Sequence, residues 1–128
     1  MTTAPILIAD DDPVVRHILG SILKSLGHSA ESVDSGVKCI EHLRACCTKS
    51  QLPRVLFLDL QLTDMTGAEV LLQLGEFLDL KVMPVIILSA NSREEAKKSY
   101  PTLTADEFLE KPFAPQAVAE VLQRLGIS

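Results

Sequence analysis

Polar residues of the kinds used in phosphoryl chemistry follow several short apolar runs along the 128-residue chain. Residues 5–9 lead into three aspartates, residues 55–58 into a fourth, residues 82–88 into a serine, and residues 108–110 into a lysine. Each run is short enough to be a buried strand, and ligands of open α/β sheets bind at the carboxyl ends of the strands. The residues placed in this way are Asp10, Asp11, Asp12, Asp59, Ser89 and Lys111. Carboxylates, a hydroxyl and an ammonium group at one edge suggest that a divalent cation and a phosphoryl group bind there.

The segments between these runs predict the elements that position the polar residues. Strand and helix patterns alternate, which is typical of βαβ units around a parallel sheet. The expected strands cover residues 5–10, 28–33, 54–59, 82–89 and 106–110, and the expected helices about residues 13–26, 36–47, 67–78, 93–100 and 115–125. Asp12, the pair at 34–35 and Ser92 are expected to cap helices, and Gly27 to end the first helix.

Right-handed crossovers would put helices on both faces of the sheet, so the expected fold class is α/β, a flavodoxin-like (βα)5 doubly wound sandwich. A single sequence does not determine the strand order. The flavodoxin-like order 2-1-3-4-5 would place the first and third strands side by side and bring Asp10, Asp11 and Asp59 together. The second helix is expected to bury one apolar face, made of Val37, Ile40, Leu43 and Cys47.

The acidic residues suggest a metal site and a nucleophile. Asp10 and Asp11 would repel each other when half buried, and a hard cation such as Mg²⁺ makes their clustering favourable. Asp59 ends the most hydrophobic strand, where aspartate is disfavoured. It is either a turn former or a nucleophile that accepts a phosphoryl group as an acyl phosphate. Ser89 and Lys111 would then contact the phosphate as a hydrogen-bond donor and a point charge.

Composition limits the classes of partner. The net charge is −5 and the chain has no cluster of Lys and Arg, which argues against nucleic-acid binding. No apolar run approaches the roughly 18–20 residues that span a membrane, and the N-terminus lacks a signal peptide, so we expect a cytoplasmic protein. Cys39, His42 and Cys46 are spaced like metal ligands. Zinc sites usually take ligands from two separated pairs, however, so partly buried helix residues are the better interpretation.

Over essentially its whole length the chain resembles a response-regulator receiver domain of two-component signalling. The resemblance rests on five motifs that occur in the family's order, each weak alone but specific together. They are Ile6-Leu7-Ile8-Ala9-Asp10-Asp11-Asp12-Pro13, Leu56-Phe57-Leu58-Asp59-Leu60, Asp64-Met65-Thr66-Gly67, Ile86-Ile87-Leu88-Ser89-Ala90 and Phe108-Leu109-Glu110-Lys111-Pro112-Phe113.

The resemblance implies roles for the acidic residues. Asp59 would be the phosphoacceptor. Asp10 and Asp11 would be the acidic pair that holds Mg²⁺, the one cofactor implied. Asp11, Asp59 and the backbone carbonyl of Gln61 would be its direct protein ligands.

The resemblance also implies a switch and two kinds of partner. Ser89 would be the hydroxyl that moves to the phosphoryl group, and Phe108 the aromatic residue whose rotamer reports activation. Lys111 would contact the phosphate, and its peptide bond to Pro112 is cis in the family. The phosphoryl donor would be a sensor histidine kinase or a histidine phosphotransfer protein. A downstream protein would bind the face formed by the fourth helix, the fifth strand and the fifth helix.

We therefore expect a single receiver domain, residues 1–128, that is a phosphorylation-dependent switch and not a turnover enzyme, although it catalyses its own phosphotransfer and dephosphorylation. No DNA-binding or enzymatic effector occurs within the chain, so it either acts by protein contacts alone or belongs to a longer protein. A pseudo-receiver that only binds partners is an alternative, but such domains usually lack the acceptor or the lysine. An aspartate-nucleophile phosphatase of the haloacid-dehalogenase type needs a second Asp where this chain has Gln61.

The chain departs from the family pattern at three places. Thr63 stands where the family often has Pro, and residues 104–105 replace a common Gly-Ala pair. Residues 100–103 replace the usual end of the fourth helix. These departures leave the chemistry unchanged and fall mainly on the expected output face.

Overall fold

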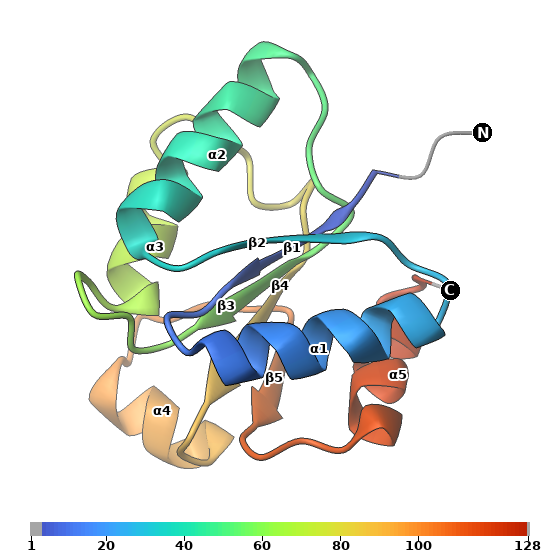
Figure 1. Cartoon of the computed structure of the whole chain (residues 1–128). Coiled ribbons are helices and arrows are strands. Elements are labelled where there is room, and N and C mark those ends of the chain that lie inside the picture. The colour runs from blue at the N-terminus through green and yellow to red at the C-terminus, as the bar shows by residue number, and fades with distance from the viewer. Residues whose placement is uncertain (1–3, 128) are drawn as a thin grey trace.

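Five parallel strands form one sheet in the order β2-β1-β3-β4-β5 (Figure 1). The computed structural model describes residues 4–127, so Met1–Thr3, where a signal peptide was sought, and Ser128 lie outside the described residues. The strands are β1 (Ile6–Ala9), β2 (Ala30–Val33), β3 (Leu56–Asp59), β4 (Val85–Ser89) and β5 (Glu107–Glu110). The predicted flavodoxin-like α/β fold is confirmed, including the strand order.

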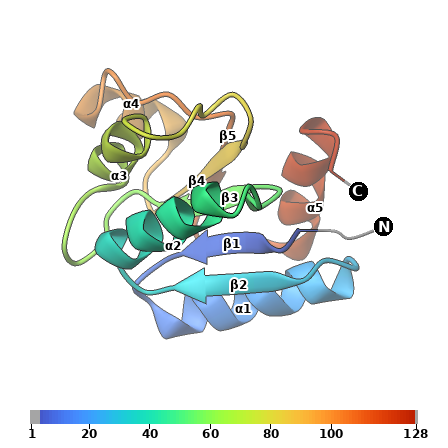
Figure 2. The same ribbon diagram turned by 90° about the horizontal axis from the view of Figure 1, so that it is seen from above.

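Helices cover both faces of the sheet, as the views from the side and from above make clear (Figures 1 and 2). Helices α1 (Pro13–Ser25) and α5 (Pro115–Arg124) pack on one face, and α2 (Gly36–Thr48), α3 (Gly67–Leu74) and α4 (Arg93–Ser99) on the other. Successive strand residues point to opposite faces, so each central strand feeds both cores. In β1, Ile6 and Ile8 pack with α1 and α5, while Leu7 and Ala9 pack with α2 and α3.

Three helix starts follow the predicted capping residues. The side chain of Asp12 accepts a hydrogen bond from the amide of Val14, and that of Ser35 accepts one from Lys38. Ser92 and Glu95 form the predicted capping box of α4, and Gly27 has the positive φ of +92° that ends a helix. Side-chain oxygens therefore satisfy amides that the first turns leave without partners.

Two predicted elements differ most in length from the observed ones. β4 begins at Val85 instead of residue 82, because residues 79–82 form a turn and Pro84 has no amide hydrogen to donate. Val82 is consequently 61 % exposed. α3 ends at Leu74 instead of residue 78, since the chain leaves the helix after Gly75, although Leu78 still reaches the core.

The prediction that Val37 belongs to the buried face of α2 is wrong. Val37 is 48 % exposed, and the buried residues of this helix are Gly36, Cys39, Ile40 and Leu43. Gly36 takes the inner position because Met65 packs so closely there that a Cβ atom would clash with its side chain. The buried face is therefore turned by one position relative to the apolar pattern.

The described part of the chain contains no helix that is both long enough and apolar enough to cross a membrane.

A histidine and an arginine meet at the amino edge of the sheet, opposite the carboxyl ends of the strands. His28 is buried, and its Nδ1 lies 3.1 Å from Nη1 of Arg54. A guanidinium only donates hydrogen bonds, so Nδ1 must accept and the ring must be neutral. Burial, and secondarily the Arg54 charge, lowers the pKa of His28 below its ordinary value of 6.5.

We predict that this pair makes the free energy of unfolding depend on pH. The folded-state pKa of His28 is depressed, so its stabilising contribution is complete above pH 6.5 and is lost as the pH falls through 6.5 towards the folded-state pKa. Urea denaturation at several pH values should show a larger loss for the wild type than for His28→Gln, whose amide oxygen can accept the Arg54 hydrogen bond without titrating. Equal losses of unfolding free energy in the two proteins would contradict the assignment of His28 as a neutral hydrogen-bond acceptor.

Candidate functional site

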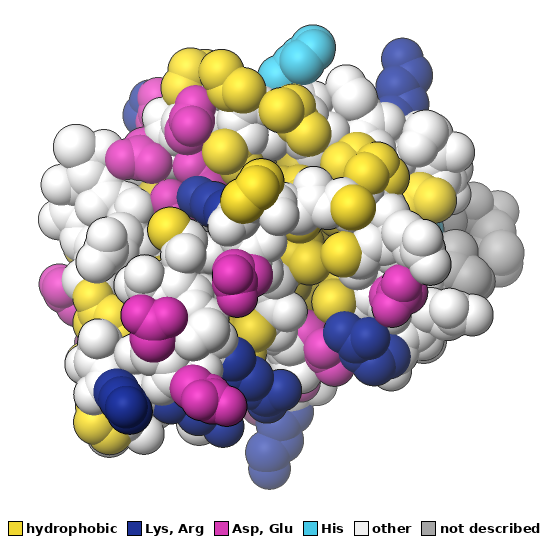
Figure 3. Space-filling model, turned by 90° about the horizontal axis from the view of Figure 1, so that it is seen from below, with side chains coloured by type: hydrophobic (Ala, Val, Ile, Leu, Met, Phe, Trp, Pro, Cys, Tyr) yellow, Lys and Arg dark blue, Asp and Glu magenta, His cyan; other side chains and the backbone are white. Residues whose placement is uncertain are grey.

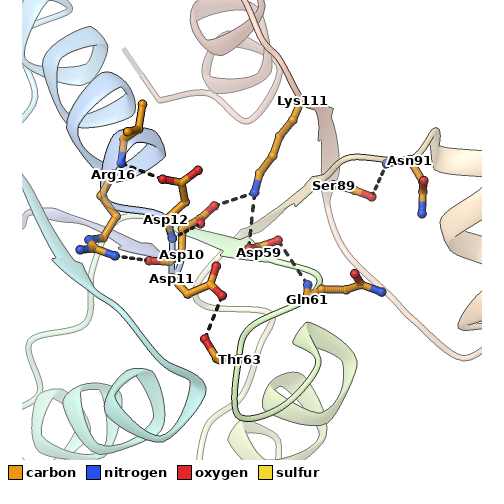
Figure 4. Close-up of polar contacts among 11 residues, drawn as sticks. Asp10, Asp11, Asp12, Arg16, Asp59, Gln61, Thr63, Ser89, Asn91 and Lys111 are labelled. Carbon is orange, nitrogen blue, oxygen red and sulfur yellow. Dashed lines mark hydrogen bonds and ion pairs between the residues drawn. The ribbon is translucent and has the colours of Figure 1, made fainter.

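Four strand ends bring the predicted site residues together at the carboxyl edge of the sheet (Figure 4). Asp10 directly follows β1, Asp59 ends β3, Ser89 ends β4, and Lys111 directly follows β5. Asp10, Asp59 and Ser89 are buried, with exposed fractions of 0 %, 6 % and 5 %. Hydrophobic strands thus hold three polar side chains in fixed positions at one edge.

Three of the aspartates form a compact acidic group. Ligand oxygens of Asp10, Asp11 and Asp59 lie within 4.8 Å of one another, whereas the side chain of Asp12 is turned away to cap α1. Oδ1 of Asp10 accepts a hydrogen bond of 2.9 Å from the amide of Asp12, but Oδ2 is buried without a well-directed hydrogen bond. The three carboxylates repel one another, and these hard oxygen donors fit a Mg²⁺ ion.

Lys111 supplies the positive charge of the group. Its ammonium nitrogen lies 2.8 Å from Oδ2 of Asp10 and 3.4 Å from Oδ2 of Asp59. The amide of Lys111 donates to the carbonyl of Ser89 at 2.7 Å, which fixes the end of β5 against the end of β4. The Lys111–Pro112 peptide is cis, as the resemblance implied. One ammonium therefore serves two buried carboxylates that repel each other.

The pKa values reflect this excess of negative over positive charge. Burial, with a further contribution from Asp10, raises the pKa of Asp59 from 3.8 to about 6, against the opposing effects of Lys111 and the Gln61 amide. Burial alone would lower the pKa of Lys111, but its hydrogen bonds and charge interactions with Asp10 and Asp59 raise it. Asp59 is therefore ionised at neutral pH at a free-energy cost, which a cation would reduce.

A hollow of about 180 Å³ lies beside Asp59 on the side of β4, and Ser89, Asn91, Tyr100 and Lys111 are among its lining residues. Figure 4 shows Asp59 between the acidic pair on one side and Ser89 with Asn91 on the other. The Ser89 hydroxyl oxygen accepts a hydrogen bond of 3.0 Å from the amide of Asn91, so the hydroxyl hydrogen stays available. A small anionic group attached to Asp59 would meet this hydroxyl and the ammonium of Lys111.

Gln61 lies beside the acidic group, and Phe108 lies on β5. The amide of Gln61 donates to Oδ1 of Asp59 at 3.2 Å, which holds its backbone beside the acidic group. Phe108 is half-buried on β5, and the guanidinium of Arg93 from α4 lies 5.2 Å from the centre of its ring. Phe108 thus links β5 to α4.

Sequence reasoning missed two contacts to the acidic pair. Nη1 of Arg16 donates to the backbone carbonyl of Asp10 at 2.7 Å, and the hydroxyl of Thr63 donates to Oδ2 of Asp11 at 2.9 Å. The Thr63 contact joins residues 52 positions apart, so the only available signal was the departure from Pro at residue 63. Within the described residues, the three aspartates are the only group with metal-ligand geometry, so Cys39, His42 and Cys46 form no such group.

Comparison with known proteins agrees with this geometry. Residues 6–123 match the family described as the response regulator receiver domain. The chain belongs to this family. The two-component response regulator ORR11 of Oryza sativa subsp. indica is 30 % identical over 94 % of this chain and 79 % of its own length. The transcriptional regulatory protein GltR of Pseudomonas aeruginosa is 32 % identical, and the match covers 94 % of this chain but 46 % of GltR.

Solved receiver structures share the fold. The chemotaxis protein CheY4 of Vibrio cholerae superposes with a TM-score of 0.81 at 24 % identity, covering 96 % of this chain and 98 % of CheY4. The receiver domain of the sensor histidine kinase PA1611 from Pseudomonas aeruginosa has a TM-score of 0.82 at 22 % identity, covering 96 % of this chain and 97 % of that domain. That structure contains a magnesium ion coordinated in its active-site cleft. This receiver belongs to a family of signalling switches.

We predict that Asp59→Asn stabilises the metal-free receiver. The folded-state pKa of about 6 exceeds the ordinary 3.8, so ionisation of Asp59 at pH 7.5 disfavours the folded state, and removal of the charge should raise the free energy of unfolding by roughly 1–3 kcal/mol. Urea denaturation in EDTA measures this difference. The gain should shrink as the pH approaches 4, where the wild-type carboxyl is protonated. A variant less stable than the wild type at pH 7.5 would contradict the account.

Proposed function

We propose that this receiver takes a phosphoryl group onto Asp59 from a phosphohistidine in a Mg²⁺-dependent reaction and passes the signal to a protein partner by a change of conformation. One observation carries the proposal: Asp59 is buried between an acidic pair with an incompletely satisfied oxygen and a hollow that Ser89 and Lys111 line.

Asp59 is the nucleophile in this proposal. One of its carboxylate oxygens forms a bond to phosphorus while the bond from phosphorus to the donor's imidazole nitrogen breaks, and the electron pair leaves with the imidazole. The ammonium of Lys111, 3.4 Å from Oδ2 of Asp59, is placed to neutralise charge on the transferred group. The Ser89 hydroxyl lines the same hollow and can donate to a phosphoryl oxygen.

Asp11, Asp59 and the backbone carbonyl of Gln61 would hold Mg²⁺, with Asp10 completing the acidic group. The ion supplies positive charge for the phosphoryl oxygens. Asp10 is the most buried of these residues, and its contact with Lys111 makes it the link between the cation site and the phosphate contact. The magnesium ion in the PA1611 receiver supports this assignment by analogy of fold.

The phosphoryl donor, a sensor histidine kinase or a histidine phosphotransfer protein, would bind beside the acidic group. Val14 and Ile18 of α1 are 60 % and 46 % exposed and closely follow the Asp10–Asp12 segment. Figure 3 shows the face on which α1, α4 and α5 lie, with apolar side chains gathered next to charged ones. An exposed apolar patch beside a reactive carboxylate suits a partner that must deliver its phosphohistidine without water.

The downstream partner would bind the face made of α4, β5 and α5. α4 has seven residues, of which only Ala96 is buried, so little packing holds it. Movement of the Ser89 hydroxyl towards a phosphoryl group would shift the end of β4, the strand that precedes α4. The contact between Arg93 of α4 and Phe108 of β5 would then change. The single-domain extent of residues 1–128 and the cytoplasmic location stay predictions.

Phosphorylation of Asp59 is the direct test. Incubation with acetyl phosphate and Mg²⁺ should add the mass of one phosphoryl group to the intact protein, and Asp59→Asn should abolish the addition. Asp11→Ala should slow labelling at least tenfold. A Mg²⁺ site has few protein ligands, so the removal of one of them weakens binding of the ion strongly. Intact-mass spectrometry over time gives both rates.

Asp79→Asn is the matched control, since it makes the same chemical change at an exposed turn far from the site. It should label like the wild type. Equal labelling of Asp59→Asn and the wild type would overturn the phosphoacceptor assignment. Undiminished labelling in EDTA would overturn the Mg²⁺ requirement.

A further inference from the structure

One hydrogen bond connects the acidic pair to the loop that follows β3. The hydroxyl of Thr63 donates to Oδ2 of Asp11 at 2.9 Å, as the close-up shows (Figure 4). Within the described residues this is the only hydrogen bond to the Asp11 carboxylate, and no donor contacts its Oδ1. The contact therefore orients the carboxylate and leaves one of its oxygens open to a ligand.

Asp11 needs such a restraint more than the other two aspartates. Asp10 and Asp59 are buried and are held by backbone amides and by Lys111. Asp11 is exposed, so its side chain would otherwise sample several rotamers. A cation that binds Asp11 would then have to order it, which costs affinity.

The loop itself is rigid enough to place Thr63. Gln61 and Thr66 pair as an antiparallel bridge, and the amide of Leu62 donates to the carbonyl of Met65 at 3.0 Å. Gly67 packs so closely on β3 that an added Cβ would lie 2.7 Å from the carbonyl oxygen of Asp59. Thr63 lies between these anchors, so its backbone position is fixed from both sides.

Asp64 attaches the same loop to α2. Its carboxylate oxygens accept hydrogen bonds of 2.9 and 3.0 Å from the amides of Gly36 and Val37, in the first turn of that helix. These bonds favour the ionised carboxylate and lower the pKa of Asp64. The β-branched side chain of Thr63 adds stiffness at χ1 to this fixed backbone.

The geometry points to Thr63 as a positioning residue that holds Asp11 in the orientation in which it binds a divalent cation. The inference rests on the proposed Mg²⁺ site and names Thr63 as a residue that sets the affinity of that site for Mg²⁺. Hydrogen-bonded partners of ligating carboxylates commonly contribute about 10–100-fold to metal affinity. Thr63 and Asp11 are exposed, and water can replace the hydroxyl, so we expect an effect near tenfold, at the lower end of that range.

The test is the Mg²⁺ dissociation constant of the unphosphorylated protein. Amide signals of residues 10–12 and 59–61 are followed by NMR as Mg²⁺ is added, for the wild type, Thr63→Val and Thr63→Ser. Valine keeps the shape without the hydroxyl, and serine restores the hydroxyl. Thr48→Val is the matched control, because it removes a hydroxyl that donates to a backbone carbonyl at the far end of α2.

Thr63→Val should weaken Mg²⁺ binding about tenfold, while Thr63→Ser and Thr48→Val bind like the wild type. Unchanged or tighter binding by Thr63→Val would overturn the inference while leaving the proposed function intact. If Thr63→Ser bound Mg²⁺ as weakly as Thr63→Val, the inference would also be overturned, since packing and not the hydroxyl would then set the affinity. A wild type that does not bind Mg²⁺ at these residues would overturn the proposed cation site itself.

Discussion

The ammonium of Lys111 between two buried carboxylates is the interaction on which the rest of the structure depends. It lies 2.8 Å from Asp10 and 3.4 Å from Asp59, yet the pKa of Asp59 is still raised to about 6. The site thus holds more negative charge than its own residues neutralise. Such a site is unfavourable for folding alone and suited to a cation and a transferable anion, so we interpret the imbalance as stability given up for function.

The parallel sheet makes this cluster possible. Residues from β1, β3, β4 and β5, as far apart in sequence as Asp10 and Lys111, meet because all four strands end at the same edge. Two hydrophobic cores, one on each face, hold the strands firmly enough to keep polar groups buried. Helix α4, which the proposed signal would move, is packed more lightly and buries only Ala96.

Much of this arrangement could be predicted from the sequence, because it depends on local patterns. Apolar runs that end in Asp, Ser or Lys mark strand ends, and the caps at Asp12, Ser35 and Ser92 mark helix starts. Features that depend on tertiary contacts could not be predicted. The outward position of Val37 follows from the packing of Gly36 against Met65. The bond from Thr63 to Asp11 needs two loops 52 residues apart to be placed first.

A crystal structure of the receiver with Mg²⁺ and beryllofluoride would test the account most directly. We expect beryllofluoride on the carboxylate of Asp59, with the Ser89 hydroxyl and the Lys111 ammonium against it. We expect the Mg²⁺ ion on Asp11, Asp59 and the carbonyl of Gln61. An Asp59 free of beryllofluoride, or a cation bound away from Asp11, would contradict the claim that this uncompensated acidic group is a phosphoacceptor site.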